Sequence, residues 1–270
     1  MAPSPEETLP ADQGLMDVLT YLKNIPDFQA RAGESICKAF EEIIDTERTD
    51  RWGLDSLEKT EKTYIGTKVE ILFRNEFKFS RGRSLDNLIC EKEVDTKFSL
   101  TRAWMIPAEA VGQLCLLVSG NDQRKSFDVG LVRADLDILN PGSNRDGKRT
   151  LSSIGRTAIQ WIVLNAPLPM TLLSELDVGI RDQIRNQTSA AKRIQTLFEL
   201  VQNRAISRFT ISTICRTQDP LKRAREAKPY LLKKGILVLC STYLGERQEI
   251  INRGFSNIAD DEWISVDVNH

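Results

Sequence analysis

The sequence is poor in histidine, cysteine pairs and long apolar runs, and each shortage argues against a class of protein. Its one histidine is His270, which argues against a catalytic triad, a cysteine–histidine pair or a histidine zinc site. Five cysteines without any C-x-x-C spacing predict neither a disulfide framework nor a thiolate zinc site. The longest apolar runs, residues 114–118 and 235–240, fall far short of the ~18 residues of a transmembrane helix. An enzyme of this composition must work with carboxylates and lysines, with or without a hard metal ion.

The composition is that of a folded globular protein. Hydrophobic residues make up 41% and charged residues 28% of 270 residues, and this length predicts roughly two domains. Residues 1–10 lack the basic start and the apolar stretch of a secretory signal, and their prolines predict a loose tail. The expected location is the cytoplasm.

Charge is nearly balanced overall but uneven along the chain. The formal net charge is −1, yet residues 181–235 carry 13 Lys+Arg against 4 Asp+Glu, a local net of +9. Such a stretch is the footprint that a polyanion such as DNA requires. The alternative is a solvated helical surface with incidental charge.

The first part of the chain predicts a mixed helix and strand fold. Helical periodicity occurs at residues 15–22, 32–44 and 67–77. Strand-like segments broken by Gly, Asn and Asp follow at residues 84–99, 113–119 and 127–133. We therefore expect an α/β (α+β) domain in which helices cover a mixed central sheet.

A linker is predicted near residue 165. A helix is expected at residues 151–161, and Pro167 and Pro169 then indicate a linker over residues 164–169, giving domains 1–164 and 165–270. Beyond it, helices are expected at residues 172–187, 190–203, 207–215 and 219–227, and strands at 235–240 and 263–268. Several helices followed by a short hairpin are typical of a winged helix-turn-helix.

One carboxylate and lysine pattern fits metal-dependent phosphodiester hydrolysis. That reaction needs at least two acidic side chains to hold Mg²⁺ and a cation to position the attacking water. One arrangement has an Asp, then a strand with Asp/Glu-x-Lys, and a Glu from a neighbouring helix. The tripeptide occurs four times, at Glu76/Lys78, Asp95/Lys97, Asp146/Lys148 and Glu226/Lys228. Only Asp95/Lys97 lies in a strand-like run with an acid, Asp86, shortly upstream. The alternative is a solvent-facing row of mixed charge.

Glu70 is the candidate acid from a helix. It lies at the margin of the apolar face, near Phe73 and Phe77 on the helical wheel. A carboxylate there would be partly desolvated and would need a partner, which a metal ion supplies.

These residues belong to segments that resemble a known family. Residues 62–70, Asp86, residues 94–99 and residues 103–107 are similar to the NaeI family of type II restriction endonucleases, and the similarity continues through residues 144–149 and 155–156. It covers the first domain nearly end to end and is fainter at residues 178–183, 204–215 and 222–225. The resemblance implies a homodimer whose subunits have a restriction-endonuclease-like domain and a catabolite-activator-like helix-turn-helix domain. The second domain would bind another copy of the recognition site and activate cleavage.

The resemblance also implies a catalytic set, namely Glu70, Asp86, Asp95 and Lys97. In this hypothesis Asp86 and Asp95, with the Thr96 carbonyl, coordinate Mg²⁺, and Glu70 binds directly or through water. Lys97 orients the nucleophilic water. The expected substrate is double-stranded DNA, without a nucleotide cofactor and without a membrane partner.

Two basic regions are candidate DNA contacts. Residues 142–148 fit G-x-x-x-x-G-K, but Arg149 stands where a phosphate loop needs Ser or Thr. A basic turn touching phosphates through Asn144, Arg145, Lys148 and Arg149, or a solvated loop, fits better. In the second domain Asp219-Pro220 opens a candidate recognition helix with Lys222, Arg223 and Arg225. The phosphate contacts expected there are Arg204, Arg208 and Arg216, with Lys233 and Lys234.

Two alternative functions fit the same residues. One is a winged-helix DNA-binding regulator with an inactive nuclease domain, and the other is a monomeric nicking repair endonuclease. The recognition sequence does not follow from these residues.

Overall fold

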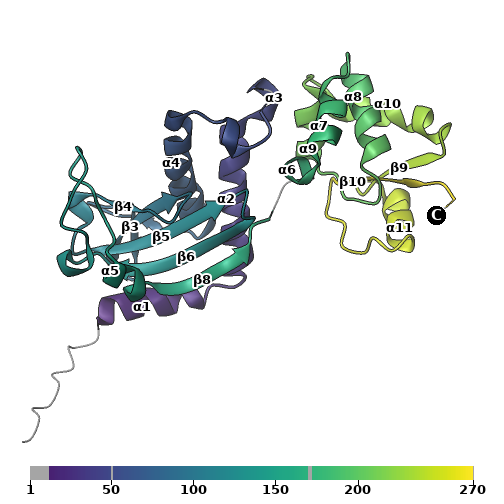
Figure 1. The fold of residues 1–270 in the computed structure, drawn as a ribbon. Coiled ribbons are helices and arrows are strands. Elements are labelled where there is room, and N and C mark those ends of the chain that lie inside the picture. The colour runs from purple at the N-terminus through teal and green to yellow at the C-terminus, as the bar shows by residue number, and fades with distance from the viewer. Residues whose placement is uncertain (1–11, 50, 170–171, 270) are drawn as a thin grey trace, which may run out of the picture. The chain divides into compact units, whose positions relative to one another are not determined.

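The computed structural model describes residues 12–49, 51–169 and 172–269, so the tail predicted for residues 1–10 lies outside the described residues. The chain divides into two compact units (Figure 1). The first unit comprises residues 1–43 and 54–170, and the second comprises residues 44–53 and 171–270. The second unit therefore includes a ten-residue excursion from the first half of the chain.

The first unit is built on a mixed sheet of six strands in the order β1-β2-β3-β5-β6-β8. The strands are β1 (Ser80–Arg81), β2 (Asn87–Ile89), β3 (Lys92–Ser99), β5 (Leu114–Asn121), β6 (Ser126–Arg133) and β8 (Gln160–Pro167). Strands β3 and β5 pair in parallel, and the other neighbours pair antiparallel. A separate pair joins β4 (Met105–Ile106) to β7 (Arg149–Thr150). The mixed central sheet predicted from the sequence is confirmed.

Helices cover this sheet. They are α1 (Gln13–Lys23), α2 (Phe28–Ile44), α4 (Lys59–Glu76) and α5 (Ser153–Ala158), with short 3-10 helices η1 (Leu54–Ser56), η2 (Ala108–Ala110) and η3 (Leu136–Ile138). Helix α1 lies along β6 and β8, and α4 lies over β3 (Figure 1). Gly120 of β5 lets α2 approach closely, because a Cβ at this position would lie 2.8 Å from Ile36. These contacts place the helix that carries Glu70 beside the strand that carries Asp95.

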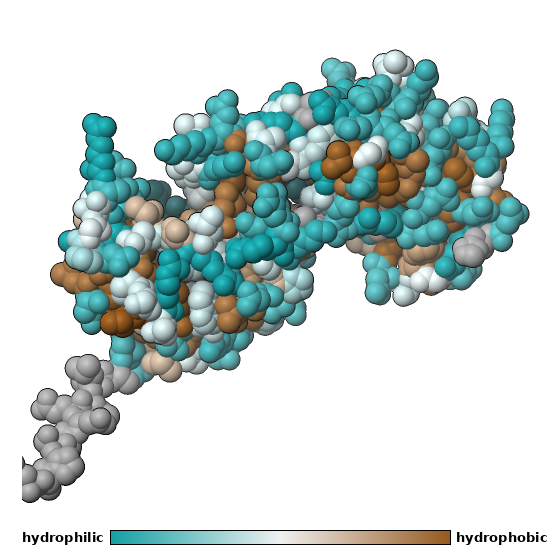
Figure 2. All heavy atoms as spheres, viewed as in Figure 1, coloured by the Kyte–Doolittle hydropathy of each residue, from teal (hydrophilic) through white to brown (hydrophobic). Residues whose placement is uncertain are grey.

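The core of the first unit lies on both faces of the sheet. One apolar cluster is formed by Trp104, Ile106, Ala110, Cys115, Leu117, Val132, Ala134, Ile138, Leu139, Leu151 and Ile159. Alternation along the strands places Leu116, Val118 and Leu131 on the opposite face, where they are also fully buried. On the face drawn in Figure 2, hydrophilic residues cover most of the surface and apolar residues lie in separate patches.

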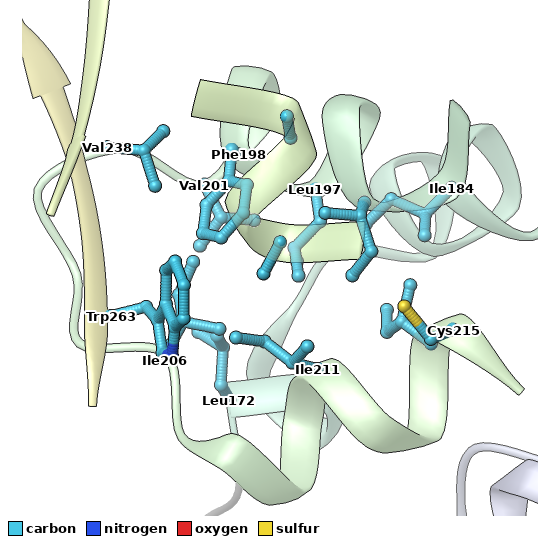
Figure 3. Close-up of a cluster of buried hydrophobic side chains, with 14 of the residues drawn as sticks. Leu172, Ile184, Leu197, Phe198, Val201, Ile206, Ile211, Cys215, Val238 and Trp263 are labelled. Carbon is cyan, nitrogen blue, oxygen red and sulfur yellow. The ribbon is translucent and has the colours of Figure 1, made fainter. Parts of the chain in front are cut away.

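The second unit is mainly helical. Its helices are α3 (Thr46–Thr49), α6 (Leu172–Glu175), α7 (Val178–Arg185), α8 (Ala190–Leu200), α9 (Arg208–Cys215), α10 (Pro220–Leu232) and α11 (Leu244–Asn252). Strands β9 (Ile236–Cys240) and β10 (Trp263–Asp267) pair antiparallel. Figure 3 shows side chains from α6 to α9 converging with Val238 and Trp263 in one buried cluster. Trp52 of the excursion packs against this cluster.

Several predicted elements differ from the structure. The helix expected at residues 151–161 is only α5, and the linker expected at 164–169 is largely strand β8. Pro167 is tolerated because it ends an edge strand, where the sheet needs no donor from it. The compact units divide after residue 170 and not near 165.

The second unit also departs from the predicted outline. Strands β9 and β10 are joined by residues 241–262, which contain α11, and not by a short hairpin turn. The helix expected at 172–187 is divided into α6 and α7, because Asp177 caps α7 through the Gly179 N–H at 2.7 Å. Helix α10 continues to Leu232, five residues beyond its predicted end.

Candidate functional site

Helix α4 brings Glu70 to the edge of the apolar core. The helix begins with a capping box between Glu58 and Glu61, and Val69 and Phe73 are fully buried. The Glu70 side chain is 24% exposed, and its Oε1 accepts a hydrogen bond of 2.7 Å from Arg74 Nη2. The predicted position at the margin of the apolar face is confirmed.

Strand β3 carries the central pair of the site. Asp95 is 3% exposed, so the alternative of a solvent-facing row of charge is wrong at this residue. Lys97 Nζ lies 2.9 Å from Asp95 Oδ1 and 2.8 Å from Oδ2. The same ammonium donates to the Thr96 carbonyl at 3.3 Å. One amine thus contacts both oxygens of a buried carboxylate and a backbone oxygen.

Asp86 reaches this pair from the loop before β2. Its Oδ2 accepts the Thr96 N–H at 2.8 Å and lies 3.8 Å from Lys97 Nζ. The antiparallel pairing of β2 with β3, predicted from the sequence as a hairpin, puts Asn87 opposite Val94. Asp86 and Asp95 therefore meet at the same lysine.

Glu93 organises the loop that leads to Asp86. Its carboxylate accepts the backbone N–H groups of Arg83, Ser84 and Leu85 at 2.8 to 3.2 Å. These bonds hold the pKa of Glu93 below its ordinary value. This role of Glu93 was not predicted from the sequence. The signal was its position two residues before Asp95, which puts both acids on the same face of β3.

Burial sets the electrostatics of the acids. Burial raises the pKa of Asp95 to about 7, against the attraction of Lys97. Burial, together with the nearby Asp86 charge, also raises the pKa of Glu70. Burial opposes the charged form of Lys97, but Asp95 and Asp86 outweigh it and raise the pKa of this lysine. The site therefore has three carboxyl groups for two basic side chains, Lys97 and Arg74.

The other copies of the Asp/Glu-x-Lys pattern lie in different surroundings. Glu76 pairs with Arg31 at 2.7 Å, and Glu226 of α10 pairs with Arg223 at 2.6 Å. Asp146 lies in the exposed loop 141–148. Asp95 is the buried acid of the four copies, and its neighbours include Asp86 and Glu70.

The donor set suits a hard divalent cation. Three carboxylates and a backbone carbonyl offer oxygen ligands, which Mg²⁺ and similar ions prefer. Among the described residues Asp95 Oδ2 is buried without a hydrogen-bond partner, and its close neighbour is the Lys97 ammonium. In the same part of the chain no three acidic, cysteine or histidine side chains form a ready metal-binding group. Lys97 pairs with Asp95, and Arg74 pairs with Glu70.

The loop at residues 142–148 is not a phosphate loop. Such a loop opens a helix, whereas this one leads into strand β7. Asn144 Oδ1 accepts the N–H groups of Asp146 and Lys148 at 3.0 and 2.9 Å, so the side chain of Asn144 closes the turn. Arg145 and Lys148 are exposed, and Arg149 is half-buried at the start of β7.

The basic residues of the second unit gather on α9 and α10 and the segments that flank them. Arg208 begins α9, Arg216 follows it in left-handed backbone (φ 52°), and Asp219 caps α10 through the Lys222 N–H at 2.9 Å. Exposed acids contact several of these cations, in the pairs Arg204–Glu175, Arg208–Asp261, Lys222–Glu226, Arg223–Glu226, Arg225–Asp219 and Lys234–Glu199. Such exposed pairs contribute little to stability.

Comparisons with known proteins identify the class of enzyme. A sequence model of a family described as restriction endonuclease NaeI matches residues 20–270. A curated relative, the type II restriction enzyme NaeI of Lentzea aerocolonigenes, is 36% identical over 225 residues, which are 79% of this chain and 70% of that enzyme. The protein is a type II restriction endonuclease, a site-specific deoxyribonuclease. It belongs to the NaeI restriction endonuclease family, and the resemblance found in the sequence is confirmed.

Membership of this family fixes two further properties in general form. The substrate is DNA, and type II restriction endonucleases generally depend on a divalent metal ion. None of the helices in the described residues is long and apolar enough to span a membrane.

Proposed function

We propose that this enzyme hydrolyses double-stranded DNA with Mg²⁺, using Glu70, Asp86, Asp95 and Lys97. The observation that carries the proposal is that Asp86 and Asp95 meet at one lysine, with Nζ 3.8 and 2.8 Å from their Oδ2 atoms. Glu70 approaches from α4 closely enough for its charge to interact with Asp86 and Lys97. Acids from three separated segments therefore surround one amine.

Each residue has a distinct role in this proposal. Asp86, Asp95 and the Thr96 carbonyl would hold the ion, with Glu70 as a direct or water-mediated ligand. Bound Mg²⁺ supplies a Lewis acid for the charge that builds on the phosphate and the leaving 3′ oxygen. Lys97, which the neighbouring acids keep protonated, would release Asp95 and donate instead to the attacking water and a phosphate oxygen. These bonds would orient and help to activate the water, whose proton would pass to solvent.

A plasmid digestion tests the metal. The full-length protein is incubated with a sequenced plasmid in Mg²⁺ or in EDTA, and the product ends are mapped. We expect linear product with Mg²⁺ and none in EDTA. Cleavage that persists in EDTA would contradict the metal role, and accumulation of nicked circles would favour a nicking enzyme.

We assign the two units different tasks. In this proposal the first unit, predicted as residues 1–164, is the endonuclease domain, and the second, predicted as residues 165–270, is a catabolite-activator-like winged helix-turn-helix domain. The support is the order α9, turn, α10, in which Lys222 and Arg225 are exposed on the first turns of α10. The β9 and β10 pair would serve as the wing, although α11 lengthens its connection.

The salt dependence of DNA binding tests this surface. Each phosphate contact contributes about 0.9 log units of affinity per log unit of salt. Arg208 is one of the expected phosphate contacts and is exposed, so Arg208→Ala should lower the slope by about 1 in a binding titration with metal-free protein. Lys192→Ala is the control, because Lys192 is an exposed lysine of α8 in the same unit. Equal slopes in both variants would contradict DNA contact by this surface and favour the alternative, a solvated helical surface with incidental charge.

The proposal extends to assembly and activation. The enzyme would act in the cytoplasm as a homodimer, and a second copy of the recognition site bound to the second unit would activate cleavage. Residues 144–149 would contact phosphates from the first unit. Plasmids with one and two recognition sites, digested at equal site concentration, test activation, and light scattering measures the mass of the assembly. Equal rates on both plasmids would remove activation from the proposal.

A further inference from the structure

Two polar side chains beside the candidate site lie outside the catalytic set expected from the sequence. Arg74 follows Glu70 by one turn of α4, and its side chain is 23% exposed. Asn87 opens β2 and is fully buried. Buried amide and guanidinium groups must be hydrogen-bonded because leaving them without partners is costly. Their partners therefore show what they hold in place.

These partners form a continuous chain from the helix to the strands. Arg74 donates through Nη2 to Glu70 Oε1 at 2.7 Å and through Nε to Asn87 Oδ1 at 3.1 Å. Asn87 donates through Nδ2 to Thr96 Oγ1 at 2.8 Å. Thr96 in turn donates its backbone N–H to Asp86. The chain joins Glu70 of α4 to Asp86, in the loop before β2, and to strand β3, which carries Asp95.

The chemistry of this chain requires an arginine and an amide. A guanidinium offers donors in a rigid planar fork, so Arg74 can bond two acceptors and fix the angle between them. An amide offers both an acceptor and a donor, so Asn87 can connect a cation to a hydroxyl. A lysine at position 74 would keep the charge but lose the fork.

We propose that Arg74 and Asn87 are positioning residues that hold Glu70 at a fixed place relative to the β2–β3 hairpin, so that acids from both can share one divalent cation. This inference rests on the metal site of the proposed function. A different role for Arg74, simple neutralisation of Glu70, predicts the opposite effect. Removing a positive charge that only neutralises would strengthen cation binding, whereas losing the position of a ligand weakens it.

Calorimetric titration of the full-length, DNA-free protein with Mn²⁺ distinguishes these roles. We expect Arg74→Ala and Asn87→Ala to weaken Mn²⁺ binding by about 10- to 100-fold, as is typical when the residues that orient metal ligands are removed. Arg74→Lys should also weaken binding, because it keeps the charge without the fork. Plasmid cleavage by Arg74→Ala should be slow at low metal and approach the wild-type rate as metal is raised.

An arginine that pairs with another glutamate of α4 provides the control. Arg31 lies on α2, its Nε lies 2.7 Å from Glu76 Oε1, and its Nη2 donates to the Glu76 carbonyl at 2.7 Å. Arg31→Ala removes a guanidinium that contacts the end of α4 away from the site. We expect it to lower the melting temperature as much as Arg74→Ala does, while Mn²⁺ affinity stays within twofold of the wild type (about twofold being the precision of the titration).

The outcomes separate this inference from the proposed function. Mn²⁺ binding by Arg74→Ala as tight as that of the wild type, or tighter, overturns the positioning role. Asp95→Ala is titrated alongside and should lose Mn²⁺ binding. If the wild type binds no Mn²⁺, or Asp95→Ala binds it equally well, the proposed metal site fails and the inference fails with it.

Discussion

Asp95 and Asp128 are two buried carboxylates on strands of one sheet, and their environments act on them in opposite ways. They are 3% and 1% exposed. Burial raises the pKa of Asp95 to about 7. Burial also opposes ionisation of Asp128, but hydrogen bonds from Arg102, Ser119 and Asn165 outweigh it and hold the pKa of Asp128 below its ordinary value.

The difference lies in the number of hydrogen-bond donors. Arg102 donates to Asp128 through Nε at 2.7 Å and Nη2 at 2.5 Å, and the Ser119 hydroxyl and the Asn165 N–H (2.9 Å) add two more donors. In the part of the chain that the structure describes, Lys97 donates to Asp95 Oδ1, and Asp95 Oδ2 accepts no hydrogen bond. A buried carboxylate rich in donors fixes the fold, whereas one that lacks them is available to a cation. The sheet therefore contains one structural acid and one suited to catalysis.

The largest expected effect is the loss of cleavage in Asp95→Asn. The amide keeps the shape of the side chain but cannot hold a divalent ion, so the cleavage rate should fall on the order of 10³-fold or more. Stability should not fall, because a neutral amide is less costly to bury than a carboxylate. Single-turnover cleavage and urea denaturation measure the two effects. Glu76→Gln changes another Glu-x-Lys copy and serves as the control, and an Asp95→Asn enzyme that cuts at the wild-type rate would refute the assignment.

Asp128→Ala should have the opposite profile. Removing the carboxylate leaves the charge of Arg102 unbalanced, although its Nη2 still donates to Asn165 Oδ1 at 2.6 Å. The loss should cost about 3 kcal/mol of unfolding free energy, at the low end for a buried pair because the Arg102 side chain is 28% exposed. Urea denaturation of the full chain measures this loss. The metal affinity of the folded variant should equal that of the wild type. A stable Asp128→Ala variant would remove the contrast between the two acids.

The two acids should also differ in their response to pH. Below a pKa of about 7, a proton occupies Asp95 and competes with the cation, so Mn²⁺ affinity should fall about tenfold for each unit that pH drops below 7 and level off above it. Asp128 has a lowered pKa, so the stability it contributes is complete above its unfolded value of 3.8 and is lost only as pH falls through the lower folded value. Calorimetry from about pH 5 to about pH 8 tests both statements, because this interval includes the raised pKa of Asp95, about 7, and lies above the ordinary value of 3.8 for Asp128. A Mn²⁺ affinity that does not change with pH would contradict the statement on Asp95. A change in the stability contribution of Asp128 over this interval would contradict the statement on Asp128.

The smallest effect is expected for Ser119→Ala. This change removes one neutral donor from Asp128 while the guanidinium fork and the Asn165 N–H remain, so it should cost about 1 kcal/mol. The pKa of Asp128 should rise, and its stability contribution should therefore disappear at a higher pH than in the wild type. Acid titration of unfolding compares the two proteins. An unchanged acid midpoint would show that the hydroxyl has no part in holding the charge.

Features that depend on neighbouring residues could be predicted from the sequence. The apolar spacing around Glu70 and the alternation around Asp95 are local, and the turn between β2 and β3 follows from a few polar residues. These features indicated α4, β3 and the acids they carry. Buried Asp95 was nevertheless open to interpretation as surface charge, because alternation does not reveal which face of a strand is covered.

Features set by distant contacts could not be predicted in this way. Asn87 gave no signal of its own, because its importance comes from Arg74, 13 residues away, and from Thr96 across the hairpin. The second half of strand β8 was interpreted as a linker because of Pro167 and Pro169, whereas its pairing with β6, which is distant in the sequence, makes it a strand. Trp52 packs in the second unit against a core whose residues lie more than a hundred positions further along the chain, from Leu172 onward.

The excursion at residues 44–53 has a consequence for any attempt to dissect the enzyme at the gene level. The backbone changes units after residues 43, 53 and 170, and the second change leads through η1 into α4, the helix of Glu70. A fragment that starts after residue 170 lacks Trp52 and α3, which packs on α9. A chimera of two relatives joined at a single point after residue 170 would therefore combine residues 44–53 of one protein with residues 171–270 of the other. It keeps the native packing of the second unit only when both segments come from the same protein.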